Sequence, residues 1–274
     1  MKLSDMYKIA DEIAPKRLSD EMCQTLGYYD NSGVLVDTGD EINGIVFSLD
    51  LSNAAIEKAL QTGANLIVTH HPAIFGKISK ITVGDLLGSK LVKCIKNGIS
   101  VLSMHLNLDL AQGGTDESLM QGIISSANRV CKINAPIAVK NLQTMHTFSG
   151  GAYGRAYDLP TVSLSDFEQG LKEEFSAQHV ERYGEANRMI SRVASFCGAG
   201  ADEAAIAFAK NNGADVLISS DFKHHVITAA LEQGLAVVAL THFTSEEYGF
   251  KKYYEKICRQ IEIPCVYHTD EILL

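Results

Sequence analysis

The chain has no excess of basic residues, which narrows the partners it can bind. Its 274 residues include 24 Lys and Arg against 33 Asp and Glu, for a net charge of -9. A nucleic-acid surface needs a basic stripe for the phosphates, and the basic residues here are scattered. The composition therefore argues against nucleic acid as a partner.

Long apolar runs and closely paired cysteines are also missing. No run of 18 or more apolar residues appears, which excludes an ordinary membrane span. Residues 1–17 mix charges such as Lys2, Asp5 and Glu12 with apolar residues, so they resemble an amphipathic helix rather than a signal peptide. We therefore expect a cytoplasmic protein with no membrane partner.

The cysteines are far apart and form no C-x-x-C pair, so the sequence indicates neither a zinc knuckle nor a disulfide scaffold. We interpret them as small buried apolar residues in a reducing compartment. They are Cys23, Cys94, Cys131, Cys197, Cys258 and Cys265.

Strand-like and helix-like runs alternate in two parts of the chain. In the first part we predict strands at 44–49, 65–69 and 99–104, with helices at 52–63 and 85–97. In the second we predict strands at 192–197, 216–219 and 236–240, helices at 202–212 and 222–233, and a long final helix. This alternation predicts an α/β fold with parallel sheets and helical crossovers.

The pattern changes between these parts. Gly150 and Gly151 lie in a strand-turn-strand-like stretch, and a charged amphipathic helix begins at Ser165. We therefore expect a first α/β lobe at 1–140, a small bridging subdomain or lid at 141–188, and a second α/β lobe at 189–274.

The two α/β parts resemble each other. Ala54, Ala55, Ile56, Gly63 and Ala64 recur at the same spacing as Ala204, Ala205, Ile206, Gly213 and Ala214. With one residue of slippage, His105-x-x-x-Asp109 also matches His242-x-x-x-Glu246. We interpret this as a duplicated βαβ-type unit whose copies face each other across a site. Chance similarity between amphipathic helices is the alternative.

Metal-ligand side chains follow three of the predicted strands. They are His70, His71, Asp109, His242 and Glu246. Each alone is more often a hydrogen-bonded or solvated residue, but open α/β sheets bind ligands at the carboxyl ends of their strands. Together, imidazoles and carboxylates at equivalent strand ends favour a metal site. Asp109 is suited to bridge two cations about 3.5 to 4 Å apart.

Other polar residues near the strand ends are weaker candidates. His105 is either a proton-transfer residue beside the ligands or a buried hydrogen-bonded histidine. Gly198 and Gly200, with Asp221 at the next strand end, resemble a dinucleotide fingerprint. Glu203 stands at the third glycine, where its charge would repel a pyrophosphate, so we predict no nucleotide-cofactor residues.

Several motifs together resemble the Nif-three-like family, also known as GTP cyclohydrolase I type 2 homologues. The resemblance extends from about Tyr28 to Tyr267. It rests on V-T-H-H-P-A-I-F at 68–75, H-L-N-L-D at 105–109, S-S-D-F-K-H-H at 219–225 and T-H-F-T-S-E at 241–246, with Y-D-N-S-G-V-L-V at 29–36 and C-G-A-G at 197–200.

The resemblance implies two facing lobes with a dinuclear metal centre between them, in subunits that form a toroidal homohexamer. The family's ligands fall on His70, His71, Asp109, His242 and Glu246, for two divalent ions per subunit. Mixed histidine and carboxylate ligands suit zinc, iron, manganese or nickel. His225 matches a family histidine, and Asp221 is expected to orient it or a metal-bound water.

The sequence also departs from the family pattern. Tyr29 stands where tryptophan is usual, Ser219 and Ser220 replace Thr-Gly, and Thr241 replaces glycine. No departure removes a ligand, but substrate preference and the local loop shape do not carry over.

We therefore predict a dinuclear-metal-dependent hydrolase of a nucleotide or another phosphate-bearing small molecule. A metal-bridging hydroxide would be the nucleophile, and His105 or His225 would transfer protons. If the family name describes its chemistry, the reaction is hydration of the GTP imidazole ring at C8 with release of formate. The alternative is a non-catalytic metal-binding or regulatory protein that acts through protein partners.

Overall fold

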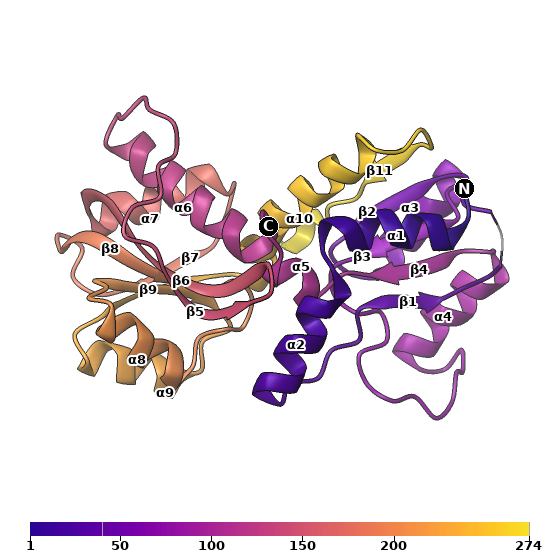
Figure 1. The fold of residues 1–274 in the computed structure, drawn as a ribbon, viewed down its shortest axis with the longest axis horizontal. Helices are drawn as coiled ribbons and strands as arrows, with labels where there is room; N and C mark the ends of the chain where they lie inside the picture. Colours follow the sequence, from indigo (N-terminus) through magenta and orange to yellow (C-terminus); the bar gives the residue numbers. More distant parts are fainter. Residues whose placement is uncertain (40, 274) are drawn as a thin grey trace. The chain divides into compact units, whose positions relative to one another are not determined.

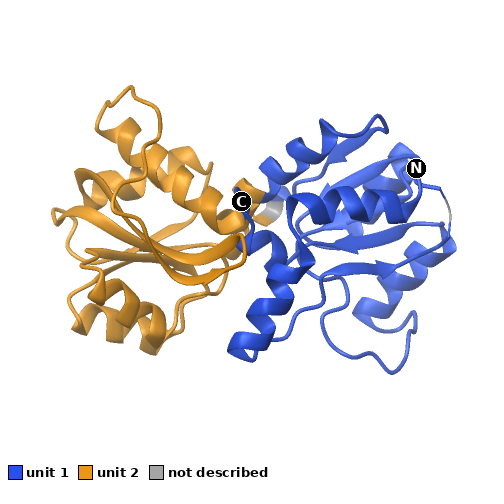
Figure 2. Cartoon of the chain, viewed as in Figure 1, with its two compact units in different colours: residues 1–114, 250–272 blue, residues 115–249, 273–274 orange. Residues whose placement is uncertain are grey.

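The computed structural model describes residues 1–39 and 41–273 and divides the chain into two compact units (Figure 2). The first unit holds Met1–Gly114 and Phe250–Ile272, and the second holds Thr115–Gly249. Each unit contains one sheet with helices, which confirms the predicted α/β class (Figure 1). In the described part of the chain, none of the helices has the length and apolar character needed to cross a membrane.

The first unit is built on a five-stranded sheet. Its order is β1 (Gly33–Val36), β4 (Ser100–Ser103), β3 (Leu66–Thr69), β2 (Ile45–Ser48) and β11 (Cys265–Tyr267). All neighbours are parallel except β1, which runs antiparallel to β4. Its helices are α1 (Leu3–Ile13), α2 (Lys16–Leu26), α3 (Asn53–Thr62), α4 (Leu86–Lys96) and α5 (Leu106–Leu110).

Local signals fix the helices that connect the parallel strands. The side chain of Ser52 accepts a hydrogen bond from the backbone N–H of Ala55 and caps α3, and Asp85 caps α4 through Gly88. Strands β2, β3 and β4 are buried along their whole length. Because helices cover parallel sheets, such strands read as continuous apolar runs rather than as an alternation.

The second unit is built on a six-stranded sheet. Its order is β5 (Gln143–Phe148), β6 (Gly151–Ser163), β8 (Met189–Ser195), β9 (Val216–Ser220), β10 (Ala236–Leu240) and β7 (Val180–Tyr183). Strands β8, β9 and β10 are parallel, as predicted, and β5, β6 and β7 join them by antiparallel pairing. The helices are α6 (Thr115–Val130), α7 (Leu164–Glu174), α8 (Glu203–Asn211) and α9 (His224–Glu232), and α10 (His242–Cys258) crosses the unit boundary.

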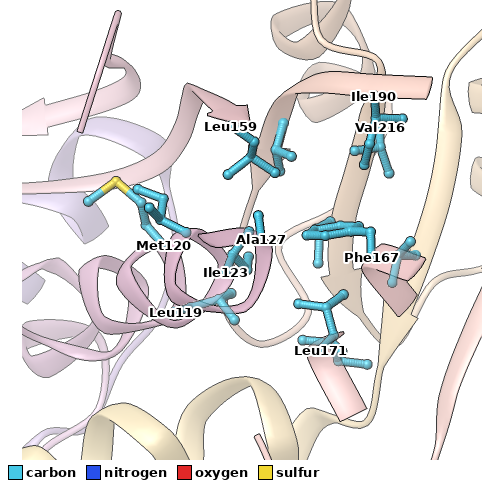
Figure 3. Close-up of a cluster of buried hydrophobic side chains, with 14 of the residues drawn as sticks. Leu119, Met120, Ile123, Ala127, Leu159, Phe167, Leu171, Ile190 and Val216 are labelled. Atoms are coloured by element: carbon cyan, nitrogen blue, oxygen red, sulfur yellow. The ribbon is translucent and has the colours of Figure 1, made fainter. Parts of the chain in front are cut away.

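Helices cover both faces of this second sheet (Figure 1). One face packs against α6 and α7, where Ile123 and Phe167 are fully buried among side chains of β8 and β9 (Figure 3). The other face packs against α8 and α9, with Ile206 and Val226 in that core. These two layers hold the carboxyl ends of β9 and β10 in place.

The repeated motif has the same local structure in both units. Ser52 and Asp202 cap α3 and α8, and Gly63 and Gly213 follow with φ angles of 70° and 68°. Each helix leads into a parallel strand. The likeness therefore extends from residue types to helix caps and strand direction.

The bounds of the two compact units differ from those of the three parts that we expected from the sequence. The segment 141–188 supplies β5, β6, α7 and β7, which join both edges of the parallel strands of the second unit. The chain end returns to the first unit because β11 pairs with β2. Both outcomes depend on pairing between strands distant in sequence.

Candidate metal centre

Three histidines gather at one edge of the first sheet. His70 and His71 follow β3, and His105 follows β4, its parallel neighbour. Parallel neighbours end at the same edge, so these imidazoles meet. The ring centre of His70 lies 5.1 Å from that of His71 and 5.4 Å from that of His105. The ring centres of His71 and His105 are 6.0 Å apart.

Asp109 joins this group from helix α5. Its Oδ1 lies 3.4 Å from Nε2 of His70, and both side chains are buried. Ligand atoms of His70, His105 and Asp109 all lie within 4.8 Å of one another. The first unit thus brings together three predicted ligands with His105, which the sequence predicted as a proton-transfer residue.

The imidazole of His70 is fixed by the backbone. Its Nδ1 lies 2.8 Å from the carbonyl oxygen of Met104. A carbonyl oxygen only accepts, so Nδ1 donates, and in the neutral ring the lone pair lies on Nε2. That nitrogen faces the carboxylate of Asp109, and a cation between two such acceptors would satisfy both.

His71 is held by Asp50, a residue that the sequence analysis did not single out. Nδ1 of His71 donates to Oδ1 of Asp50 at 2.8 Å, again leaving Nε2 for a ligand. Asp50 follows β2, so it obeys the same strand-end rule as the histidines. Asp50 could therefore have been found in the sequence from its position just after a predicted strand.

His105 is held in the same way by Asp30. Its Nδ1 donates to Asp30 Oδ1 at 2.8 Å, and Ser19 and Ser32 donate to the other oxygen at 2.5 and 2.6 Å. Burial by itself would raise the pKa of Asp30, but these hydrogen bonds outweigh it and hold the pKa well below its usual range. Asp30 stands in the Y-D-N-S-G-V-L-V motif, which carried no residue role in the sequence analysis.

The second unit holds the other two predicted ligands. His242 begins α10 just after β10, and its Nε2 lies 3.1 Å from Oε2 of Glu246, one helical turn later. Its Nδ1 donates to Asp221 at 2.6 Å. Asp221 follows β9 with a left-handed φ of 51°, and it orients His242 rather than His225.

Glu246 lies against the C-G-A-G turn. Gly198 has a φ of 57°, and a Cβ there would be 2.4 Å from Oε1 of Glu246. The turn is fixed because Gly198 N–H donates to Ser245 Oγ, and its carbonyl accepts from Ser220 Oγ. Cys197 Sγ also lies within 4.8 Å of a Glu246 oxygen. Glycine is thus the residue that leaves room for this carboxylate.

The remaining predicted residue lies apart from these contacts. His225 is exposed on α9, and its Nε2 is 3.5 Å from Glu203 at the start of α8. His268 contacts Asp270 at 3.1 Å. Burial lowers the pKa of His146.

One arrangement is shared by the four histidines of both groups. His70, His71, His105 and His242 each use Nδ1 to donate to a fixed oxygen. Metal-binding histidines are commonly oriented in this way, with Nε2 directed to the ion. The donor set therefore fits divalent metal ions.

Comparisons with known proteins find relatives that match most of the chain. A GTP cyclohydrolase 1 type 2 homolog of Clostridium perfringens is 30% identical over 96% of this chain and 93% of its own length. A Schizosaccharomyces pombe protein named NIF3 homolog is 26% identical over 94% of this chain and 88% of its own length.

Solved structures show the same fold. The crystal structure of a hypothetical protein of Staphylococcus aureus superposes with a TM-score of 0.79 at 22% identity, covering 98% of this chain and 96% of that one. The family described as Duf34/NIF3 (NGG1p interacting factor 3) matches residues 1–270. With a match over nearly its whole length, the chain belongs to the DUF34/NIF3 family.

Proposed function

We propose that the protein is a metal-dependent hydrolase of a nucleotide or another phosphate-bearing small molecule. The observation that carries the proposal is the set of four imidazoles whose Nδ1 is held by an oxygen, with Nε2 of His70 beside Asp109 and Nε2 of His242 beside Glu246. Bound divalent ions would supply Lewis acidity and activate water for hydrolysis. The relatives' name makes GTP the first nucleotide to test.

From the resemblance to the family, we propose five ligands for two ions. His70, His71 and Asp109 come from the first unit, and His242 and Glu246 from the second. In this proposal Asp50 and Asp221 hold the imidazoles in the binding tautomer. The sequence resemblance to the family supports the pairing of the two ligand sets.

His105 is proposed to transfer protons near the substrate. Its Nδ1 is held by Asp30. In this proposal its Nε2 exchanges a proton with the substrate or with the attacking water. The ionised Asp30 stabilises the imidazolium that forms when His105 accepts a proton. His225 stays a sequence prediction, since its contact is with Glu203.

We also propose that the subunits assemble as a homohexamer, on the motif resemblance alone. Sedimentation equilibrium of the purified protein tests the assembly. A mass near six times 29.8 kDa supports it, whereas a stable monomer or dimer contradicts it.

The function is tested by metal content and turnover measured together. We expect purified wild-type protein to carry divalent metal and to hydrolyse GTP or a generic phosphoester. His71→Ala and Glu246→Ala should lose metal and activity while the circular dichroism spectrum stays unchanged. His224→Ala is the matched control because that histidine is exposed on α9. Metal-loaded protein that is inert across nucleotides and phosphoesters would overturn the hydrolase and favour a binding role.

A further inference from the structure

Two aromatic side chains stand exposed beside the histidine cluster of the first unit. Tyr29 and Phe75 are 54% and 51% exposed, and their rings meet edge to face with centres 5.5 Å apart. Phe75 also meets His105 edge to face, at 6.2 Å. A continuous series of ring contacts thus leads from Tyr29 through Phe75 to the imidazoles.

Hydrogen bonds between side chains and the backbone hold the segments that carry this aromatic pair. Asn31 Nδ2 donates to the carbonyl oxygen of Ile74 at 2.6 Å, which ties the segment of Phe75 to the segment of Tyr29. The N–H of Ala73 donates to Ser103 Oγ at 3.2 Å, which ties the same segment to β4. Tyr29 also directly precedes Asp30, the residue that orients His105.

The geometry leaves ring surface open. About half of the surface of Tyr29 and of Phe75 stays accessible to solvent although their rings contact each other. Contiguous exposed apolar surface rimmed by polar residues is a known mark of ligand-binding sites. A planar aromatic ring is the shape that matches such a surface, because stacking needs only a π-face.

We propose that Tyr29 and Phe75 form an aromatic platform for the nucleobase, or another planar heterocycle, of the substrate, in which one ring stacks on the base and the other, nearly perpendicular to it, contacts the edge of the base. This inference rests on the proposed function and narrows its substrate class to phosphate-bearing molecules with an aromatic ring. The ring lies on the platform, and the rest of the molecule extends past His105 toward the metal ligands.

The test compares two ligands that differ by the base. Guanosine monophosphate and ribose 5-phosphate are titrated calorimetrically into metal-loaded protein. We expect wild-type protein to prefer the nucleotide. Phe75→Leu should weaken nucleotide binding by about tenfold, Phe75→Tyr should retain it, and ribose 5-phosphate should bind all three alike. Ile78→Ala is the control, because Ile78 is similarly exposed on the same segment.

The possible outcomes test the aromatic platform and the proposed hydrolase function independently of each other. Equal binding of both ligands by a metal-loaded protein that hydrolyses phosphoesters overturns the platform and leaves the hydrolase intact. If the protein carries no metal, the hydrolase fails, and quenching of tyrosine fluorescence by guanosine still tests the platform. A change of oligomeric state in Phe75→Leu without a change in guanosine binding overturns the platform and assigns the surface to contacts between copies.

Discussion

Asp50 and His71 are joined by a 2.8 Å hydrogen bond between two neighbouring parallel strand ends. The carboxylate fixes which imidazole nitrogen carries the proton, and so which one is available to an ion. The same arrangement recurs between Asp221 and His242 in the second unit. Acidic residues behind the histidines are therefore as much a part of the proposed centre as the ligands.

Removing this carboxylate should weaken metal binding without unfolding the protein. We expect Asp50→Ala to lower metal affinity by about 10- to 100-fold, because His71 loses its orientation and part of its basicity. Competition with a chelator measures the affinity. Glu57→Ala is the control, since Glu57 is an exposed carboxylate of the same unit that pairs with Lys93. Equal affinity of Asp50→Ala and wild type contradicts the assignment.

Gly198→Ala should disturb the second ligand pair. The added Cβ meets Glu246 Oε1 at 2.4 Å, so the carboxylate must move and metal affinity should fall. Gly213→Ala is a matched control, because Gly213 has a similar φ of 68° with no atom within 4 Å of the added Cβ. Both changes should cost about 1 kcal/mol or more of stability, measured by urea unfolding. Equal metal affinity in the two variants would contradict this role for Gly198.

A buried ion pair should dominate the stability of the second unit. Arg155 donates to Asp116, which also accepts from the backbone N–H groups of Gly154 and Cys197 at 3.2 and 3.1 Å. Asp116→Ala leaves the buried guanidinium of Arg155 with only a 3.9 Å contact to Glu117 and a hydrogen bond to the Ala152 carbonyl, and should lower the free energy of unfolding by about 3 kcal/mol. Arg259→Ala removes an exposed pair and should cost less than about 1 kcal/mol. Similar midpoints in denaturant for both variants would refute this ranking.

The thiol of Cys265 should react slowly at neutral pH. Burial, and then the neighbouring Cys258, raise the pKa of Cys265 to about 12. Because the thiolate is the nucleophile, its alkylation rate should still be rising at pH 10, measured by peptide mass spectrometry with iodoacetamide. Cys258→Ser removes the charge of the neighbouring thiolate and should speed the reaction. A plateau near pH 9 in wild-type protein would contradict the shift.

Elements with local signals were predictable from the sequence. Helix α3 has its cap at Ser52 and its stop at Gly63, both readable along the chain. Helix α6 was not predicted, because buried residues such as Asp116, Ser118 and Ile123 lie on most of its faces. A helix buried nearly all round lacks the polar stripe that periodicity detects.

The division of the chain into two units could not be predicted from local sequence signals either. Strand β11 returns to the first unit through pairing of Cys265 with Ile45, across most of the chain. No periodicity in a short apolar run says which strand it will pair with, because register and partner follow from the packing of the whole sheet.

The sequence by itself determined the residue types of the candidate centre, because the histidines follow strands whose apolar runs are locally recognisable, and Asp109 and Glu246 lie four residues after His105 and His242. Tertiary structure alone decided how those side chains are used. The oxygens that hold His71 and His105 come from Asp50 and Asp30, 21 and 75 residues away along the chain. The position of the proton on an imidazole depends on the acceptor that the fold places beside it, and that is a property of packed strands rather than of neighbours in sequence.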